Sequence, residues 1–291
     1  MPTELGPIDA ERLLTFAIPS IRQAILPRDA AFYALSIGAE NLDQVDPLRG
    51  PLALPSMALV LAHPGFWMAH PKSGINPVAV LHAAQSFEIT GPIPIEGHVN
   101  SRTQITGLID KGLGKPALVL TETLLATDDG APIALLRRTT LIRGGGGFGN
   151  SFGEDTQPVL SEGPGGTAPD HVVDLPTHPR QALLYRLNGD LNPLHSDPVV
   201  AKRAGFDRPI LHGLCTMGIV TRALMHAMRP RDTTLSKVAL RFSQPIYPGE
   251  TVRTEIWADG RFQARALERD TLIASHGLFA AGATHSRDHV S

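Results

Sequence analysis

The 291-residue chain contains a single cysteine, few aromatic residues and no long uninterrupted hydrophobic run. One cysteine, Cys215, excludes an intramolecular disulfide, which fits a reducing compartment. This cysteine lies in an apolar stretch, so packing is its expected role and not nucleophilic attack. No segment reaches the ~18 consecutive apolar residues that a membrane-spanning helix requires. A membrane is therefore not expected among the partners.

The chain also lacks a strong charge of either sign, with a formal net charge of −2. This balance argues against nucleic acid or an anionic surface as the main partner. Residues 1–12 have neither the basic start nor the apolar centre of a signal peptide, and the final residues His289-Val290-Ser291 do not match the peroxisomal S-K-L signal. The cytoplasm is the expected location. An apolar content of 42% supports a substantial core.

Hydrophobic patterning predicts an α+β fold, because helices are followed by runs of strands and do not alternate with them. Strands are expected at 78–89, 97–109, 117–127, 133–142, 237–242, 251–257, 262–268 and 272–280. Helices are expected at 9–26, 28–37, 179–187, 199–204 and 213–228, and residues 52–62 are compatible with either a helix or a strand. The predicted organisation is an N-terminal part (1–143), a connection (144–169) and a C-terminal part (170–291).

The predicted connection is rich in glycine and proline, as exposed linkers are. It contains a formal G-x-G-x-x-G at Gly144, Gly146 and Gly149. A dinucleotide site would need a helix to start there, and the following Asn-Ser-Phe-Gly provides no helix start. A linker is the better interpretation.

The run Y-R-L-N-G-D-L-N-P-L-H-S-D-P (185–198) places Asp190, Asn192 and His195 within six residues. Prolines after an asparagine and an aspartate keep the chain out of a regular helix. A turn that brings the three side chains together could hold one water molecule between an acid and a base. A plain polar turn uses the same residue types, so the run alone does not decide between the two interpretations.

A second stretch, P-I-L-H-G-L-C-T-M-G (209–218), begins a long apolar helix that is predicted to be mostly buried. Gly213 would lie at its N-terminus, where backbone N–H groups lack internal acceptors and negative charge is favoured. Such an N–H could stabilise a developing oxyanion. Close helix packing is the alternative reason for a glycine at this position.

A metal site is the obvious rival for a D-x-N-x-x-H-x-D pattern. The calcium-loop template requires an oxygen ligand at its fifth position and glycine at its sixth, where this chain has Leu194 and His195. Zinc could recruit His212, but the spacing does not favour it. Neither a metal nor an organic cofactor is expected.

Together the two stretches resemble the hydratase-2 motif of the MaoC-like, (R)-specific enoyl-CoA hydratases, nearly continuously from Tyr185 to Gly213. Asn188 departs from the pattern, because serine or threonine is usual there, and this puts one local contact in question. The resemblance implies a double hot-dog fold, in which each repeat has a curved antiparallel sheet wrapped around a long central helix. It also implies that Asp190, Asn192 and His195 are catalytic. The Gly213 amide would receive the thioester oxygen, and His212 would lie beside it on the substrate-binding side.

The implied reaction is reversible hydration of trans-2-enoyl-CoA to (3R)-hydroxyacyl-CoA. A hot-dog acyl-CoA thioesterase and a non-catalytic acyl-CoA-binding protein are the alternatives. The phosphates of coenzyme A need only a local basic rim, for which the candidates are Lys202, Arg203, Arg208 and Arg241. Exposed sheet edges leave a homodimer open.

The two parts look like copies of one unit. Tyr33 and Tyr185, each two residues before a leucine, are 152 positions apart, and so are Gly97 and Gly249. A duplicated hot dog would place two helices against one continuous sheet. At the same offset, the residues that correspond to the Asp, Asn and His of the active turn are Gly38, Glu40 and Asp43. The first repeat is therefore expected to keep the scaffold without the chemistry, with its altered wall making room for an acyl chain.

Overall fold

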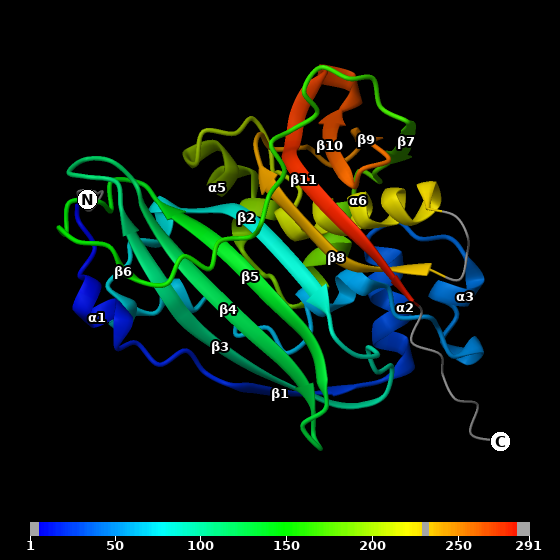
Figure 1. Ribbon diagram of the computed structural model, residues 1–291, viewed down its shortest axis with the longest axis horizontal. Coiled ribbons are helices and arrows are strands. Elements are labelled where there is room, and N and C mark those ends of the chain that lie inside the picture. Colours follow the sequence, from blue (N-terminus) through cyan, green and yellow to red (C-terminus); the bar gives the residue numbers. More distant parts are fainter. Residues whose placement is uncertain (1–5, 229–232, 284–291) are drawn as a thin grey trace.

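The computed structural model describes residues 6–228 and 233–283, with the side chains of 233 and 283 left out. One antiparallel sheet of eleven strands dominates it (Figure 1). The strands are β1 (Ile21–Ile25), β2 (Val80–Ile89), β3 (Gly97–Asp110), β4 (Ala117–Thr127), β5 (Pro132–Ile142), β6 (Phe152–Gly153), β7 (His171–Pro176), β8 (Thr233–Phe242), β9 (Thr251–Ile256), β10 (Arg261–Ala266) and β11 (Thr271–Ala283).

The helices are α1 (Ala10–Leu14), α2 (Pro27–Ser36), α3 (Leu42–Val45), α4 (Gln181–Tyr185), α5 (Pro198–Arg203) and α6 (Gly213–Ala227). Short 3₁₀ segments connect them: η1 (Pro47–Arg49), η2 (Pro55–Leu59), η3 (Trp67–Ala69), η4 (Pro71–Ser73), η5 (Pro77–Ala79), η6 (Arg186–Asn188), η7 (Pro193–His195) and η8 (Leu267–Arg269). None of the helices in these ranges is long and apolar enough to cross a membrane.

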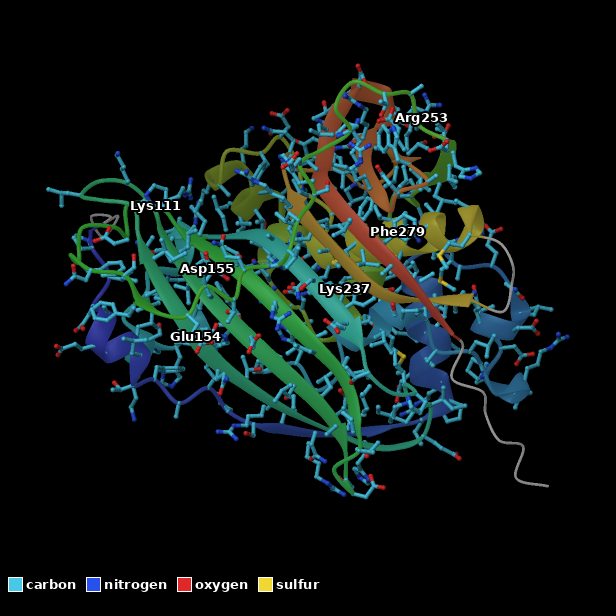
Figure 2. The ribbon with its side chains drawn as sticks, viewed as in Figure 1. Lys111, Glu154, Asp155, Lys237, Arg253 and Phe279 are labelled. Carbon is cyan, nitrogen blue, oxygen red and sulfur yellow. The ribbon has the colours of Figure 1, made fainter. Side chains whose placement is uncertain are left out.

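The strand order shows the duplication directly. It runs β1-β3-β4-β5-β2 in the first repeat and continues β8-β11-β10-β9-β7 in the second, so the halves mirror each other about the β2–β8 junction. There, Ser86 pairs with Ala239 and Phe87 with Val238. Lys237 of β8, labelled in Figure 2, also forms an ion pair with Glu88 of β2 at 3.7 Å. The predicted double hot dog with one continuous sheet is confirmed.

Residues related by the repeat offset also contact each other beneath the sheet. The Tyr33 and Tyr185 rings lie 6.4 Å apart in an edge-on arrangement. The Asn188 side chain donates to Ser36 Oγ at 2.8 Å, and these two residues are 152 positions apart. A contact between equivalent positions marks a two-fold axis, here an internal one. The unusual Asn188 therefore joins the two repeats, and it also donates to the Tyr185 carbonyl at 2.9 Å.

Helix α6 is the central helix of the second repeat. Most of its residues are buried, because its apolar side chains face both the curved sheet and the segments from the first repeat. Gly218 allows the closest approach, since a Cβ there would lie 2.7 Å from Ile37 Cγ2. The predicted helix 213–228 is confirmed.

At 52–62, where a helix or a strand was expected, the first repeat forms the short η2, and residues 60–64 leave it as an irregular segment. Ala62 has a φ of +46°, a left-handed value that does not continue a helix, and Pro64 has no N–H to donate. The shortened element leaves the space between this segment and the sheet of the first repeat less completely filled.

The predicted helix at 9–26 is wrong. The chain forms the short α1, then passes Pro19 and pairs β1 with β3. Strand β7 was not predicted. The other expected strands and helices are found with boundaries shifted by a few residues.

The glycine run at 144–149 has a structural explanation. Asp110 accepts hydrogen bonds from the backbone N–H groups of Gly112, Gly147 and Gly149 at 2.7–2.8 Å. These bonds lower the pKa of its carboxyl, and the one from Gly147 has the largest effect. A Cβ on Gly146 would lie 2.6 Å from a backbone oxygen. The two-residue strand β6, not a helix, follows the run. The boundaries 1–143, 144–169 and 170–291 remain a prediction.

Candidate active site

Local capping interactions hold the turn at 189–195, which carries Asp190, Asn192 and His195. Gly189 ends η6 with φ +113°, a value that favours glycine, and Pro193 begins η7. Asn192 holds this turn together: its N–H donates to Asp190 Oδ1 at 3.2 Å, and its side-chain oxygen accepts from Leu194 N at 3.0 Å. Asn192 thus positions both the Asp190 carboxylate and the segment that carries His195.

His195 is buried, with 8% of its surface exposed, and its Nδ1 lies 2.9 Å from the carbonyl oxygen of Ile210. A carbonyl only accepts, so Nδ1 carries the hydrogen and Nε2 keeps its lone pair. Burial lowers the pKa of His195, against the raising effects of Ile210 and Asp190. A neutral imidazole with a free Nε2 is a proton acceptor near pH 7.

Asp190 remains ionised beside it. Burial raises the pKa of Asp190, but its interactions with His212 and His195, the hydrogen bond from the Asn192 N–H and the charge of Arg138 together outweigh burial, so the pKa lies below its usual value. The site therefore presents two acceptors, a carboxylate and an imidazole nitrogen.

His212 is the residue before α6 and is almost fully buried, with 1% exposed. Its Nε2 donates to the Asp190 carbonyl at 3.2 Å, and its ring stacks on His195 with centroids 3.7 Å apart. Burial, followed by the neighbouring His195, lowers the pKa of His212 to about 3. The structure places this residue beside the pair, where it supports the His195 ring and the Asp190 backbone.

Gly213 is the first residue of α6, so its N–H has no acceptor within the helix. A Cβ at this position would lie 3.2 Å from the Phe242 ring, which is tight contact. A larger residue would therefore press against the Phe242 ring.

Asp190, His195 and His212 each offer a possible metal-ligating atom within 4.8 Å of one another. The two imidazole rings are stacked at an interplanar angle of 28°. Lone pairs lie in the ring planes, so near-parallel rings direct them side by side and not toward one tetrahedral ion. The geometry favours a water site over a metal site.

Metal removal provides a direct test of this distinction. Dialysis of the protein against EDTA is expected to leave any activity of this site unchanged, because proton acceptors and a backbone amide need no metal. Activity and metal content are measured before and after dialysis. Loss of activity that added Zn²⁺ restores would contradict the expectation.

Four histidines, two buried and two half-buried, predict how stability depends on pH. Burial is the main cause that lowers the pKa of His63 to about 4, of His212 to about 3, and of His82 and His195 below the usual value. Below a pH of about 6.5 the unfolded chain binds protons at these positions and the folded chain does not. Stability is therefore present above that pH and lost as the pH falls, by up to ~1.4 kcal/mol per pH unit per histidine. Thermal melting from pH 7.5 to 5 measures it, and a flat Tm would contradict it.

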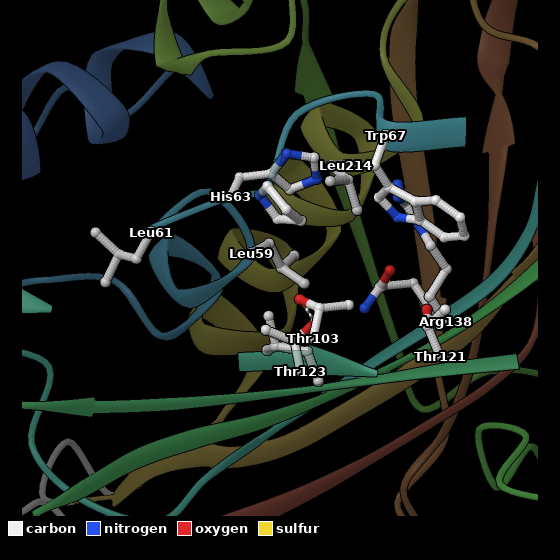
Figure 3. A pocket seen from close by; sticks show the side chains of 12 residues that line it. Leu59, Leu61, His63, Trp67, Thr103, Thr121, Thr123, Arg138 and Leu214 are labelled. Atoms are coloured by element: carbon white, nitrogen blue, oxygen red, sulfur yellow. Dashed lines mark hydrogen bonds between the residues drawn. The ribbon is translucent and has the colours of Figure 1, made fainter. Parts of the chain in front are cut away.

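A narrow cavity of about 40 Å³ lies in the first repeat, next to the site (Figure 3). Leu214 of α6, the residue after Gly213, forms part of its wall, and the segment after η2 supplies Leu61 and His63. Arg138 of β5 also lines it, and Figure 3 shows its side chain beside Thr121 and below Trp67.

Sequence reasoning missed the charged wall of this cavity. Leu136 and Arg138 both line it, whereas Arg137 pairs with Glu122 outside it. Alternation along the predicted strand 133–142 was the available signal, because residues two apart share a face. A charged residue in the same alternating row as Leu136 was the anomaly to follow.

Comparison with known proteins matches both repeats to described families. Residues 161–277 match the MaoC like domain, and residues 25–144 match the MFE-2 hydratase 2 N-terminal domain. The enoyl-CoA hydratase ChsH3 of Mycobacterium tuberculosis is 38% identical over 94% of this chain and 98% of its own. The peroxisomal enoyl-CoA hydratase 2 of Arabidopsis thaliana is 35% identical over 95% and 97%.

Solved structures agree. A MaoC-like dehydratase from Phytophthora capsici superposes with a TM-score of 0.83 and 32% identity, covering 95% of this chain and 99% of that one. A Mycobacterium tuberculosis protein described as a double hotdog fold has a TM-score of 0.57 at 15% identity, covering 95% and 98%, and supports the fold alone.

Proposed function

The chain belongs to the MaoC-like hydratase-2 family. We propose that Asp190, His195 and the Gly213 amide catalyse the addition of water across the double bond of a trans-2-enoyl-CoA. It is a hydro-lyase, and its reaction runs in both directions between enoyl-CoA and 3-hydroxyacyl-CoA. The observation that supports the assignment is a cluster of acceptors, the ionised Asp190 carboxylate and the Nε2 of His195, next to His212, the residue that precedes α6.

The reaction requires a hydroxyl at C3, a hydrogen at C2 and a place for the charge that builds on the thioester oxygen. One water molecule can donate its two hydrogens to Asp190 and to His195 Nε2. As its oxygen bonds to C3, one of these groups takes a proton and returns it to C2, so the net change is the addition of one water. General acid–base assistance of this kind contributes ~10²–10⁴-fold.

The Gly213 N–H donates a hydrogen bond to the enolate oxygen and so stabilises its negative charge. The positive end of the α6 dipole favours this charge, and the amide is already in place before the reaction begins. Because both hydrogens of the water face the same two groups, hydroxyl and hydrogen are delivered to one face of the substrate. The (3R) product is the proposed outcome.

The wild-type enzyme is tested with crotonyl-CoA and longer enoyl-CoAs, following the enoyl absorbance and the chirality of the product. Loss of absorbance without thiol release, with a (3R) product, supports hydration. Release of free thiol with unchanged enoyl absorbance would instead identify a thioesterase. Binding without turnover would identify an acyl-CoA-binding protein.

The cytoplasm is the proposed location, although the Arabidopsis relative is named as peroxisomal. A homodimer is also proposed, because β1 and β7 end the sheet with unpaired edges. Size-exclusion chromatography with light scattering tests the second proposal, and a mass of one chain would exclude it.

A further inference from the structure

The cavity beside the active site is more polar than an alkyl chain requires. Its wall contains Gln85, Thr103, Thr121, Thr123, His63 and Arg138. Several of these groups are satisfied within the protein. The Gln85 amide donates to the Ser86 carbonyl at 2.9 Å, and the Thr103 and Thr123 hydroxyls bond to each other at 2.8 Å.

Arg138 is not satisfied in this way. Its Nε and one terminal nitrogen each lie 3.1 Å from a ring nitrogen of His82. Burial, followed by the charge of Arg138, lowers the pKa of His82 well below its usual value, so the ring is neutral and has one acceptor. A guanidinium has five N–H donors in a fixed fork, and this ring can accept only one of them.

No carboxylate within residues 6–228 and 233–283 forms an ion pair with Arg138, unlike its neighbour Arg137, which lies 2.6 Å from Glu122. Arg138 is half-buried, and burial lowers its pKa against the raising effects of Asp190 and Tyr185. A partly desolvated cation without a close anion is costly, and such a group is usually paired with a ligand or a counter-charge.

A second donor faces the same space. His63 Nδ1 accepts from Gly65 N at 3.0 Å, so the hydrogen of this neutral ring is on Nε2. Arg138 and His63 together present N–H donors to a cavity that begins at Leu214. At about 40 Å³ the cavity is large enough for a small group, since a single water molecule needs ~10–15 Å³ of such space.

We propose that Arg138, assisted by His63, binds a carboxylate at the far end of a short acyl chain, so that the enzyme acts on 2-enoyl thioesters ending in a carboxylate. This inference rests on the proposed hydratase function and names its substrate class. A planar carboxylate matches the fork of a guanidinium, and charge-assisted hydrogen bonds of this type are the strong ones.

The test compares two six-carbon substrates, trans-2-hexenedioyl-CoA and trans-2-hexenoyl-CoA, which differ in the terminal group. The wild-type enzyme is expected to favour the diacid in kcat/KM by at least ~10-fold. Arg138→Met is expected to lose ~10–100-fold on the diacid and to leave the monoacid nearly unchanged. Arg137→Met, which removes a guanidinium from the adjacent position of the same strand, is the matched control and should keep the wild-type ratio.

A wild-type preference for the methyl-ended substrate would overturn the inference. An equal loss of kcat/KM on both substrates in Arg138→Met would also overturn it, because Arg138 would then act through its effect on Asp190 and not by binding the terminal carboxylate. If Arg138→Met does not fold, inhibition of the wild-type enzyme by adipoyl-CoA and hexanoyl-CoA decides instead: tighter binding of adipoyl-CoA supports the inference, and equal or weaker binding overturns it. Hydration of neither substrate by folded enzyme would refute the proposed function, while the two inhibitors still test Arg138.

Discussion

Asp190→Asn and His195→Ala are each expected to reduce kcat for enoyl-CoA hydration by ~10²–10⁴-fold, because each removes one of the two groups that exchange protons with the water. Asn at position 190 keeps an oxygen for the Asn192 N–H, so the turn should survive. Initial rates with crotonyl-CoA measure the effect, and circular dichroism with thermal melting confirms that the variants fold.

His195→Ala also leaves the Ile210 carbonyl without its donor, which costs stability. His195→Gln, which can still donate to that carbonyl, is the second variant. Asp197→Asn and His178→Ala are the matched controls. Asp197 caps α5 by accepting from Val199 N at 2.7 Å, a role that asparagine can take over, and His178 is exposed. Full activity in folded Asp190→Asn or His195→Gln would refute the assigned chemistry.

Gly213→Pro is expected to reduce kcat by ~10²–10³-fold by deleting the single N–H that would hold the enolate oxygen. Proline suits this position, because the first residue of a helix has no internal acceptor for its N–H. The preceding His212 has φ −62° and ψ 138°, extended values that are compatible with a following proline. The variant therefore removes the donor with little change to the backbone.

Gly213→Ala separates the effect of added bulk from that of the lost donor. A Cβ would lie 3.2 Å from the Phe242 ring in both variants, but alanine retains the N–H. We expect Gly213→Ala to lie much closer to the wild-type kcat than Gly213→Pro. Equal losses in the two variants would show that crowding, and not the missing hydrogen bond, causes the effect.

The sequence was a good guide where local pattern and tertiary structure agree. Alternation predicted β2 to β5 and β8 to β11, and the apolar spacing of α6 predicted a buried helix. The repeat offset also predicted the continuous sheet, which the contact between Ser36 and Asn188 marks at its axis. The active turn was found because its residues are close in sequence.

The parts that were missed depend on contacts distant in sequence. Strand β1 forms because β3 offers it an edge, although residues 9–26 also carry a helical pattern. Arg138 of the first repeat lines the same cavity as Leu214 of the second, and neither segment's sequence indicates that the two residues meet. The reduction of the first central helix to η2 was suggested only by Pro64, which alone does not give the length of the element that remains.

The loss of a central helix from one repeat has a consequence for how such an enzyme can change. In an assembly of two identical subunits every substitution occurs twice, so a change that shortens the central helix in one subunit also shortens it in the other. A covalent duplication removes that constraint. Here the end of η2 lines a cavity of the first repeat, and α6 forms the long helix of the second. Under the functions proposed above, substrate preference and catalysis would reside in different repeats of one chain, which can vary independently.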